Sequence, residues 1–271
     1  MNNPTLSIVV VSCDAYSDIV KQYLHYLHLN WPDCEYPVYV AMEKADLESS
    51  FASTVVCGSN TTWTQRAIQA IKTAGTDYVL LSVDDLFISE KVNSSDFKSV
   101  VQFIGKEKIK YYRIPVLRLD DKKETYPGNP NVELIERNKR YNVSIGTAIW
   151  DKNEILSILG DGAMSAWDLE NYFLLEAEKA KPGYLDGYVS DKRYLLHSVH
   201  MIKSGKWIPA GVNEMKRKGY SLSTAERGFI SFGDRLKLNW FYSWCSKNLP
   251  TGLRNKVKAV MKKFGFKFAS R

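Results

Sequence analysis

Short apolar strands alternate with amphipathic helices through the first 88 residues, and this alternation constrains the fold more than any other feature. Helical spacing of apolar residues marks Ile19–Leu27 and Trp63–Ala74, and Thr61 or Thr62 can cap the second helix. The strands that they separate are predicted at Leu6–Ser12, Pro37–Met42, Ser53–Cys57 and Tyr78–Ser82. This order predicts a parallel sheet with helices on both faces and right-handed crossovers.

The pattern is less regular after residue 90. Further strands are expected at 111–117 and 143–150, and helices at 95–103, 153–159 and 167–180. A polar loop occupies 119–131. The predicted fold class is therefore α/β, with a Rossmann-type arrangement that continues into a mixed central sheet.

The charge of the chain is concentrated at one end. The formal net charge is +7, but residues 235–271 contain ten of the 37 Lys and Arg and no Asp or Glu. The remaining 27 basic residues face 30 acidic ones, which leaves residues 1–234 at about −3. We therefore expect one domain at 1–234 with a basic tail at 235–271, and no nucleic-acid partner.

Two adjacent carboxylates, Asp84 and Asp85, follow the predicted strand Tyr78–Ser82. Ligands of open α/β sheets bind at the carboxyl ends of strands, and carboxylate oxygens are suitable ligands for Mg²⁺ or Mn²⁺ against a diphosphate. The alternative is a turn that ends the strand and caps a helix. A P-loop kinase and a dinucleotide dehydrogenase are disfavoured, because neither a Walker loop nor GxGxxG follows the first strand.

These motifs resemble those of the GT-A glycosyltransferases over roughly residues 5–210. Leu6–Asp14 is similar to the first nucleotide-binding strand and loop of that family, which implies donor contacts from Val11, Ser12 and Asp14. Asp77–Phe87 resembles the DxD metal motif, with Asp85 as a metal ligand and Asp84 as a ligand or a ribose contact. Val83 replaces the first aspartate of a DxD motif that ends at Asp85, so this is a DD variant.

The same resemblance implies roles for residues outside these two motifs. Trp63 and Arg66 lie on a helix that would face the nucleotide phosphates. His200 is a candidate third metal ligand, and Lys206 is a candidate contact of the diphosphate. Each has a simpler explanation as a packed or solvated side chain. Arg113, Arg118 and Arg140 are further candidates for the leaving phosphate, and the sequence does not rank them.

An inverting transfer needs a carboxylate that accepts the proton of the acceptor hydroxyl. The segment Ser165–Phe173 offers Glu170 and Asp168, and its tryptophan-plus-acidic pattern resembles bacterial polysaccharide transferases with Glu170 as the preferred base. Alternatively both acids complement the dipole of their helix. Asp151 is expected to contact the donor sugar or to cap the helix that follows it.

The basic tail has the pattern of an amphipathic helix. Apolar residues from Leu253 to Phe268 fall on one helical face, and Lys and Arg cover the rest. Such a helix is typical of an anchor on an anionic membrane, and the alternative is a helix docked on the domain. The chain has no run of roughly 20 apolar residues and no basic start of a secretory signal, and its four Cys are scattered. We expect a cytoplasmic protein, peripheral on the inner face of the plasma membrane.

The resemblance implies a hexosyltransferase of bacterial surface polysaccharide synthesis that uses Mn²⁺ or Mg²⁺ and moves a sugar from a nucleotide-sugar donor, a UDP-sugar, to a lipid-linked glycan acceptor. Inversion is inferred from the candidate bases Glu170 and Asp168, and retention is the alternative. The alternatives are a nucleotidyltransferase and a non-catalytic, membrane-bound carbohydrate-binding protein. The first usually has Gly and a basic residue in the loop after the first strand, and Ser12–Asp18 has neither.

Overall fold

A computed structural model describes residues 4–115 and 124–231 of the chain. The chain divides into two compact units, Met1–His200 and Met201–Arg271. The boundary expected near residue 234 and the predicted tail, 235–271, lie outside the described residues. In the part of the chain that is described, no helix is long and apolar enough to cross a membrane.

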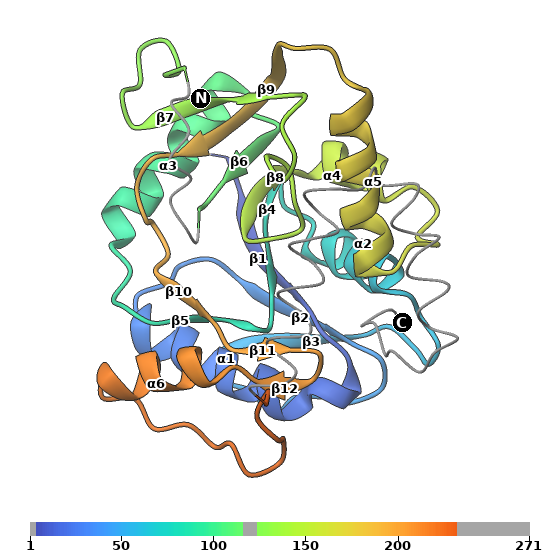
Figure 1. The fold of residues 1–271 in the computed structure, drawn as a ribbon, viewed down its shortest axis with the longest axis vertical. Coiled ribbons are helices and arrows are strands. Elements are labelled where there is room, and N and C mark those ends of the chain that lie inside the picture. The colour runs from blue at the N-terminus through green and yellow to red at the C-terminus, as the bar shows by residue number, and fades with distance from the viewer. Residues whose placement is uncertain (1–3, 116–123, 232–271) are drawn as a thin grey trace. The chain divides into compact units, whose positions relative to one another are not determined.

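A mixed sheet forms the centre of the first unit (Figure 1). Eight described strands pair in the order β3-β2-β1-β4-β8-β6-β9-β7. They are β1 (Leu6–Val11), β2 (Val38–Met42), β3 (Ala52–Val56), β4 (Tyr78–Val83), β6 (Tyr111–Arg113), β7 (Val132–Glu136), β8 (Ala148–Asp151) and β9 (Tyr184–Asp191). The pairs among β1 to β4 are parallel, whereas β8 is antiparallel to both β4 and β6. The predicted α/β fold with a mixed sheet is confirmed.

The predicted helices are present with small changes at their ends. They are α1 (Ser17–Asn30), α2 (Trp63–Ala74), α3 (Ser94–Glu107), α4 (Lys152–Leu159) and α5 (Ala166–Lys179), with a short 3₁₀ helix η1 (Asp14–Tyr16) before α1. Thr62 begins α2 through a reciprocal capping box with Gln65, and Gly75 ends it in the left-handed conformation, at φ 66°.

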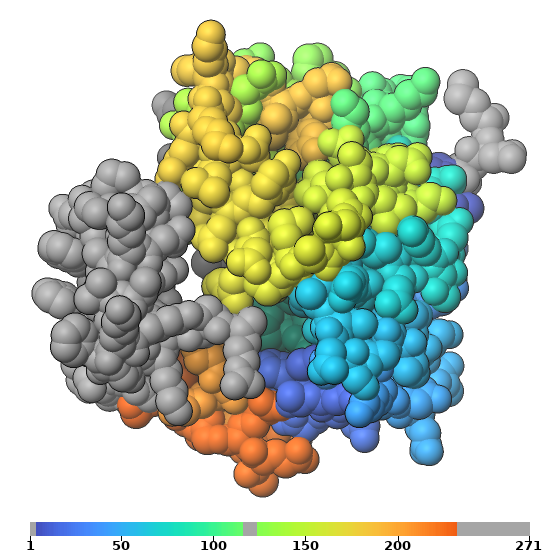
Figure 2. All heavy atoms as spheres, turned by 90° about the vertical axis from the view of Figure 1, so that its right-hand side faces the viewer, coloured from blue at the N-terminus to red at the C-terminus, as the bar shows by residue number. Residues whose placement is uncertain are grey.

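Helices cover both faces of the sheet, as the alternation of strands and helices predicts. On one face, α2, α4 and α5 pack their apolar residues onto side chains of β1, β4, β6 and β8, with Trp150 fully buried between them. Figure 2 shows the surface of these helices as adjoining patches, yellow for α5 and cyan for α2. On the other face, Trp31 at the end of α1 packs against Phe97 of α3, with ring centroids 4.6 Å apart.

The later strands are the part that the sequence pattern describes least well. The predicted strand at 143–150 is regular only in β8, and the strand predicted at 111–117 is β6, which ends at Arg113. The sequence pattern does not predict β7 or β9. In β9, a glycine and two aspartates interrupt the apolar pattern typical of a strand. Gly187 has φ 76°, a conformation that side chains with a Cβ rarely adopt, and a Cβ there would lie 3.1 Å from Cγ of Lys110, the residue before β6. Both features favour glycine at this position.

Two short strands attach His200 to the first unit. β5 (Leu86–Ile88) follows β4 directly and pairs antiparallel with β10 (Ser198–His200), which places His200 opposite Leu86. The described part of the second unit contains β11 (Ile202–Lys203), β12 (Lys206–Trp207) and α6 (Pro209–Arg217). Lys206 belongs to β12 of that unit.

Candidate functional site

The strand order reverses at β1, which is where an open α/β sheet forms a ligand crevice. From β1 the chain adds β2 and β3 on one side and then β4 on the other. Loops that leave the carboxyl ends of β1 and β4 therefore diverge. In open α/β sheets, ligands bind in the space between two such loops. The segments Ser12–Asp14 and Asp84–Asp85 lie at this position.

A hydrogen bond joins the two diverging loops. The hydroxyl of Ser12 donates to the Asp84 carboxylate, and both residues are buried, with 4% and 8% of their surface exposed. Val11, the last residue of β1, packs its side chain into the core. Its predicted contact with a nucleotide can therefore involve only its backbone.

The carboxylate of Asp85 lies beside the imidazole of His200, whereas the carboxylate of Asp84 is bonded to Ser12. The β5–β10 pairing brings Nε2 of His200 to 3.0 Å from Oδ2 of Asp85. Both side chains reach solvent, with exposed fractions of 49% and 27%. The chain thus brings together two of the three predicted metal ligands, although they are 115 residues apart in the sequence.

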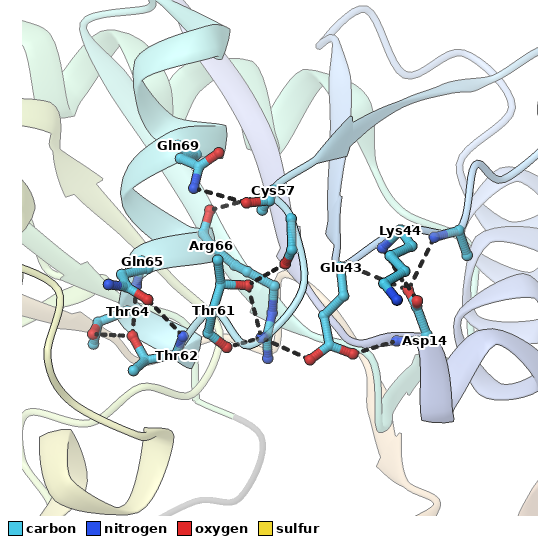
Figure 3. A network of polar contacts seen from close by, with 12 residues as sticks. Asp14, Glu43, Lys44, Cys57, Thr61, Thr62, Thr64, Gln65, Arg66 and Gln69 are labelled. Carbon is cyan, nitrogen blue, oxygen red and sulfur yellow. Dashed lines mark hydrogen bonds and ion pairs between the residues drawn. The ribbon is translucent and has the colours of Figure 1, made fainter.

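A buried arginine in the first turn of α2, Arg66, lies close to the same edge of the sheet (Figure 3). Nη1 of Arg66 donates to the backbone oxygen of Thr61 at 2.6 Å and lies 3.5 Å from Oε1 of Glu43. Glu43 follows the carboxyl end of β2, so it comes from the same edge as Asp84. The Arg66 side chain is 9% exposed, and its Nε has no hydrogen-bond partner among the described residues.

Asp14 connects the loops after β1 and β2. Its carboxylate accepts hydrogen bonds from the backbone N–H groups of Glu43, Lys44 and Ala45 (Figure 3). Desolvation alone would raise the pKa of Asp14, but these donors outweigh it and the pKa is lowered. The carboxylate is therefore ionised and acts as a brace between the loops.

Cys13 lies among the charged groups of this edge. Burial raises the pKa of its thiol, the nearby Asp84 carboxylate raises it further, and the Arg66 guanidinium opposes both. The thiol is therefore protonated at neutral pH. Its electrostatic contacts show that Asp84 and Arg66 face a common region.

The two candidate bases on α5 have different surroundings. Asp168 accepts hydrogen bonds from the backbone N–H and the hydroxyl of Ser165, so its carboxylate completes the capping box of the helix. Glu170 is half-buried, and Oε1 accepts a hydrogen bond from the backbone N–H of Ile145 at 2.7 Å. Desolvation raises the pKa of Glu170, and the Ile145 N–H opposes this only in part.

The segment 145–147 places Glu170 at the same edge of the sheet as Asp84. Ala148 of β8 pairs with Leu81 of β4, so the preceding residues run beside the carboxyl end of β4. The hydroxyls of Thr147 and Ser82 are 3.4 Å apart. Glu170, held by Ile145, is thus brought to the edge that carries Asp84 and Asp85.

One residue predicted for this site lies at the opposite edge of the sheet. Asp151 pairs with Tyr78 at the amino end of β4, and its carboxylate caps α4 by accepting from the N–H groups of Asn153 and Glu154. The alternative that Asp151 caps the following helix is therefore confirmed, and Asp151 lies at the opposite end of β4 from Asp85. Trp63 is the first residue of α2, one turn before Arg66, and packs partly buried against the core.

Glu43 and Cys13 were missed as site residues. Both follow the carboxyl end of a predicted strand, and this was the available signal. Cys13 lies within the Leu6–Asp14 motif and Glu43 lies outside any motif, and only the strand order shows that β1 adjoins β4 and that β2 lies next to β1.

The described residues contain no group of three or more His, Cys, Asp or Glu side chains arranged to hold a metal ion. Asp85 and His200 could offer two ligands, while Asp84 is engaged by Ser12. Any further ligands of an ion would have to come from phosphate oxygens and water.

Comparisons with known proteins give low similarity. No protein-family model and no curated protein matches the chain. Similar solved structures include S. aureus TarS 1-349, at TM-score 0.41 and 16% identity over 69% of this chain, and S. aureus TarS, at 0.40 and 16% over 70%. The bifunctional IspDF from Campylobacter jejuni matches 62% of this chain at TM-score 0.36 and 10% identity. The chain spans 60%, 37% and 47% of these chains, and likeness of this extent identifies neither a family nor an activity.

Proposed function

We propose that the chain is a glycosyltransferase that binds a nucleotide-sugar donor at the carboxyl ends of β1 and β4. The observation that carries this proposal is the placement of Ser12, Asp84 and Asp85 at the point where the strand order reverses. Open α/β sheets bind nucleotides there. The resemblance of Leu6–Asp14 and Asp77–Phe87 to GT-A motifs supports a sugar nucleotide, and a UDP-sugar is the expected donor.

Arg66 is the residue best placed to bind the donor diphosphate. Its guanidinium is buried at the ligand edge, and Glu43 balances part of its charge. The guanidinium carries a positive charge at this edge, and charge-assisted hydrogen bonds to phosphate oxygens are stronger than neutral ones. Asp84, fixed by Ser12, is positioned for a ribose hydroxyl.

Asp85 and His200 would hold Mn²⁺ or Mg²⁺ together with the diphosphate of the donor. When bound, such an ion stabilises the negative charge of the departing diphosphate. Their exposure allows an ion to reach them from solvent. Lys206, in the second unit, stays a further candidate contact of the diphosphate by resemblance.

Glu170 would act as the base of an inverting transfer. The acceptor hydroxyl gives its proton to the free carboxylate oxygen while its oxygen attacks the anomeric carbon, and the bond to the diphosphate breaks. A half-buried glutamate with a raised pKa is a stronger base than an exposed one. The Ile145 N–H fixes the orientation of the carboxylate.

The acceptor and the location of the enzyme belong to the same proposal. A lipid-linked glycan of bacterial surface polysaccharide synthesis is the expected acceptor, and the basic tail would hold the protein on the anionic inner face of the plasma membrane. The charge and apolar pattern of residues 235–271 support this location. Screening donors in the presence of liposomes would test both parts.

The deciding experiment is a thermal-shift screen of nucleotide sugars with and without Mn²⁺, followed by measurement of nucleoside diphosphate release. A glycosyltransferase should be stabilised by one donor and should slowly hydrolyse it. Pyrophosphate release from a nucleoside triphosphate and a sugar 1-phosphate would instead identify a nucleotidyltransferase. Stabilisation without any turnover would identify a binding protein.

A further inference from the structure

Arg113 lies at the same edge of the sheet as the proposed donor site but two strands away from it. It is the last residue of β6, and β6 runs parallel to β4 because both are antiparallel to β8 (Figure 1). Arg113 pairs with Ala148, and the backbone N–H of the next residue, Ile114, donates to the Thr147 oxygen at 3.2 Å. Arg113 therefore borders the segment 145–147 that holds Glu170.

Arg113 and Glu170 lie on the same face of the sheet, and both act electrostatically on Tyr111. Side chains alternate along a strand, so Arg113 and Tyr111 point to the same face. Burial raises the pKa of Tyr111 to about 12, while the Arg113 guanidinium lowers it and the Glu170 carboxylate raises it. No ion pair joins Arg113 to Glu170 in the described structure, so the two opposite charges face the same region without neutralising each other.

Two other arginines of the first unit have carboxylate partners, whereas Arg113 has none among the described residues. Arg193 donates two hydrogen bonds to the buried carboxylate of Asp191, and Arg140 lies 3.9 Å from Glu178 of α5. Arg113 is half-buried, yet it forms no hydrogen bond or ion pair with any described residue. No nitrogen of Arg113 is among the buried unpaired polar atoms of the described residues, so its guanidinium reaches solvent and is open to an anionic ligand.

We propose that Arg113 binds a phosphate group of the acceptor, beside the hydroxyl that Glu170 deprotonates. This inference rests on the proposed function and extends it to the acceptor. Neighbouring strands are about 4.8 Å apart, so β6 lies roughly 10 Å from β4 and farther from β1. A donor diphosphate bound between β1 and β4 is therefore served by Arg66, and Arg113 is left for the acceptor.

Ligand-detected NMR titrations can test this with a panel of hexose 6-phosphates and the matching neutral hexoses, while UDP fills the donor site. The variants are Arg113→Gln, Arg113→Lys and the control Arg217→Gln at the exposed end of α6. In the wild type and in Arg217→Gln, at least one 6-phosphate should bind about tenfold or more tightly than its neutral parent. Arg113→Gln should remove this preference, and Arg113→Lys should keep part of it.

Two results would overturn the inference. One is a wild-type protein that binds every 6-phosphate no better than its parent hexose. The other is a preference that persists in Arg113→Gln, which would assign phosphate binding to another site. UDP affinity, measured separately, distinguishes these results from a failure of the proposed function: absent UDP binding contradicts the donor site and leaves the comparison of Arg113 variants valid.

Discussion

At the scale of single residues, Glu170 is the proposed catalytic base, and burial destabilises its ionised form. Its carboxylate is held by one backbone N–H in a partly desolvated position, so its pKa is raised from the ordinary value of 4.5. The carboxylate of Asp168, two residues earlier, is engaged in the helix cap. The sequence alone offers both acids, and only the contacts of Ser165 and Ile145 distinguish them.

Replacing Glu170 with Gln should separate activity from stability. We expect kcat to fall about 10²–10⁴-fold, with donor binding almost unchanged. The melting temperature at neutral pH should not fall, because the amide oxygen can still accept from Ile145 and the ionised form is penalised by burial. Kinetics and thermal denaturation of both proteins measure these effects. A large loss of stability with normal kcat would contradict the role.

The pH dependence of the wild type and of Glu170→Gln provides a second check of the proposed base. A base must be deprotonated, so wild-type kcat should fall as the pH drops through the raised pKa of Glu170, above the range of an ordinary glutamate. The folded state holds this proton more tightly than the unfolded state does. Wild-type stability relative to Glu170→Gln should therefore decrease as the pH rises through the folded pKa and recover at acidic pH. An acid limb at the ordinary value would argue against Glu170.

The Asp85–His200 pair has its own prediction. Asp85→Asn should lower turnover by orders of magnitude without unfolding the protein, because an amide is a poorer ligand for a hard cation than a carboxylate. The stabilisation of the donor complex by Mn²⁺, measured by thermal shift, should disappear in this variant. Full activity in EDTA, or an unchanged Mn²⁺ effect, would remove the metal role from Asp85.

At the scale of elements, the capping box of α5 gives a stability prediction. Asp168→Asn weakens the hydrogen bonds to Ser165 and the interaction with the helix dipole, and should cost on the order of 1 kcal/mol of unfolding free energy. Turnover should stay near that of the wild type. Chemical denaturation and kcat would be measured together. An inactive Asp168→Asn beside an active Glu170→Gln would transfer the catalytic role to Asp168.

Elements in the first half of the chain could be predicted because each carries a strong local signal. β1 and β4 are continuous apolar runs, and α2 has a capping residue, an apolar stripe and a terminal glycine. β9 lacks such a signal, because its burial depends on β6 and β7, which are distant in the sequence. The position of Asp151 could not be predicted for a related reason: the antiparallel direction of β8, which moves it away from Asp85, is a tertiary property.

At the scale of the whole molecule, charge asymmetry leads to a prediction about the membrane. Removing residues 250–271 should sharply reduce co-sedimentation with anionic liposomes and slow transfer to a lipid-linked acceptor. Transfer to a soluble acceptor analogue should change much less. High salt should weaken binding in part, because it screens the cations and leaves the apolar face unaffected.

Neutral liposomes and the full-length protein are the controls for this truncation. Equal sedimentation of the two proteins on anionic vesicles would reject the anchor. An insoluble truncated protein would instead show that the apolar face from Leu253 to Phe268 packs against the domain.

The most direct test of the central claim is calorimetric titration of UDP, in the presence of Mn²⁺, into the wild type, Asp84→Asn and Asp151→Asn. The switch-point site predicts saturable binding to the wild type, at least tenfold weaker binding to Asp84→Asn, and unchanged binding to Asp151→Asn at the opposite end of β4. Loss of binding in Asp151→Asn with full binding in Asp84→Asn, or no UDP binding to the wild type, would contradict a nucleotide site between β1 and β4.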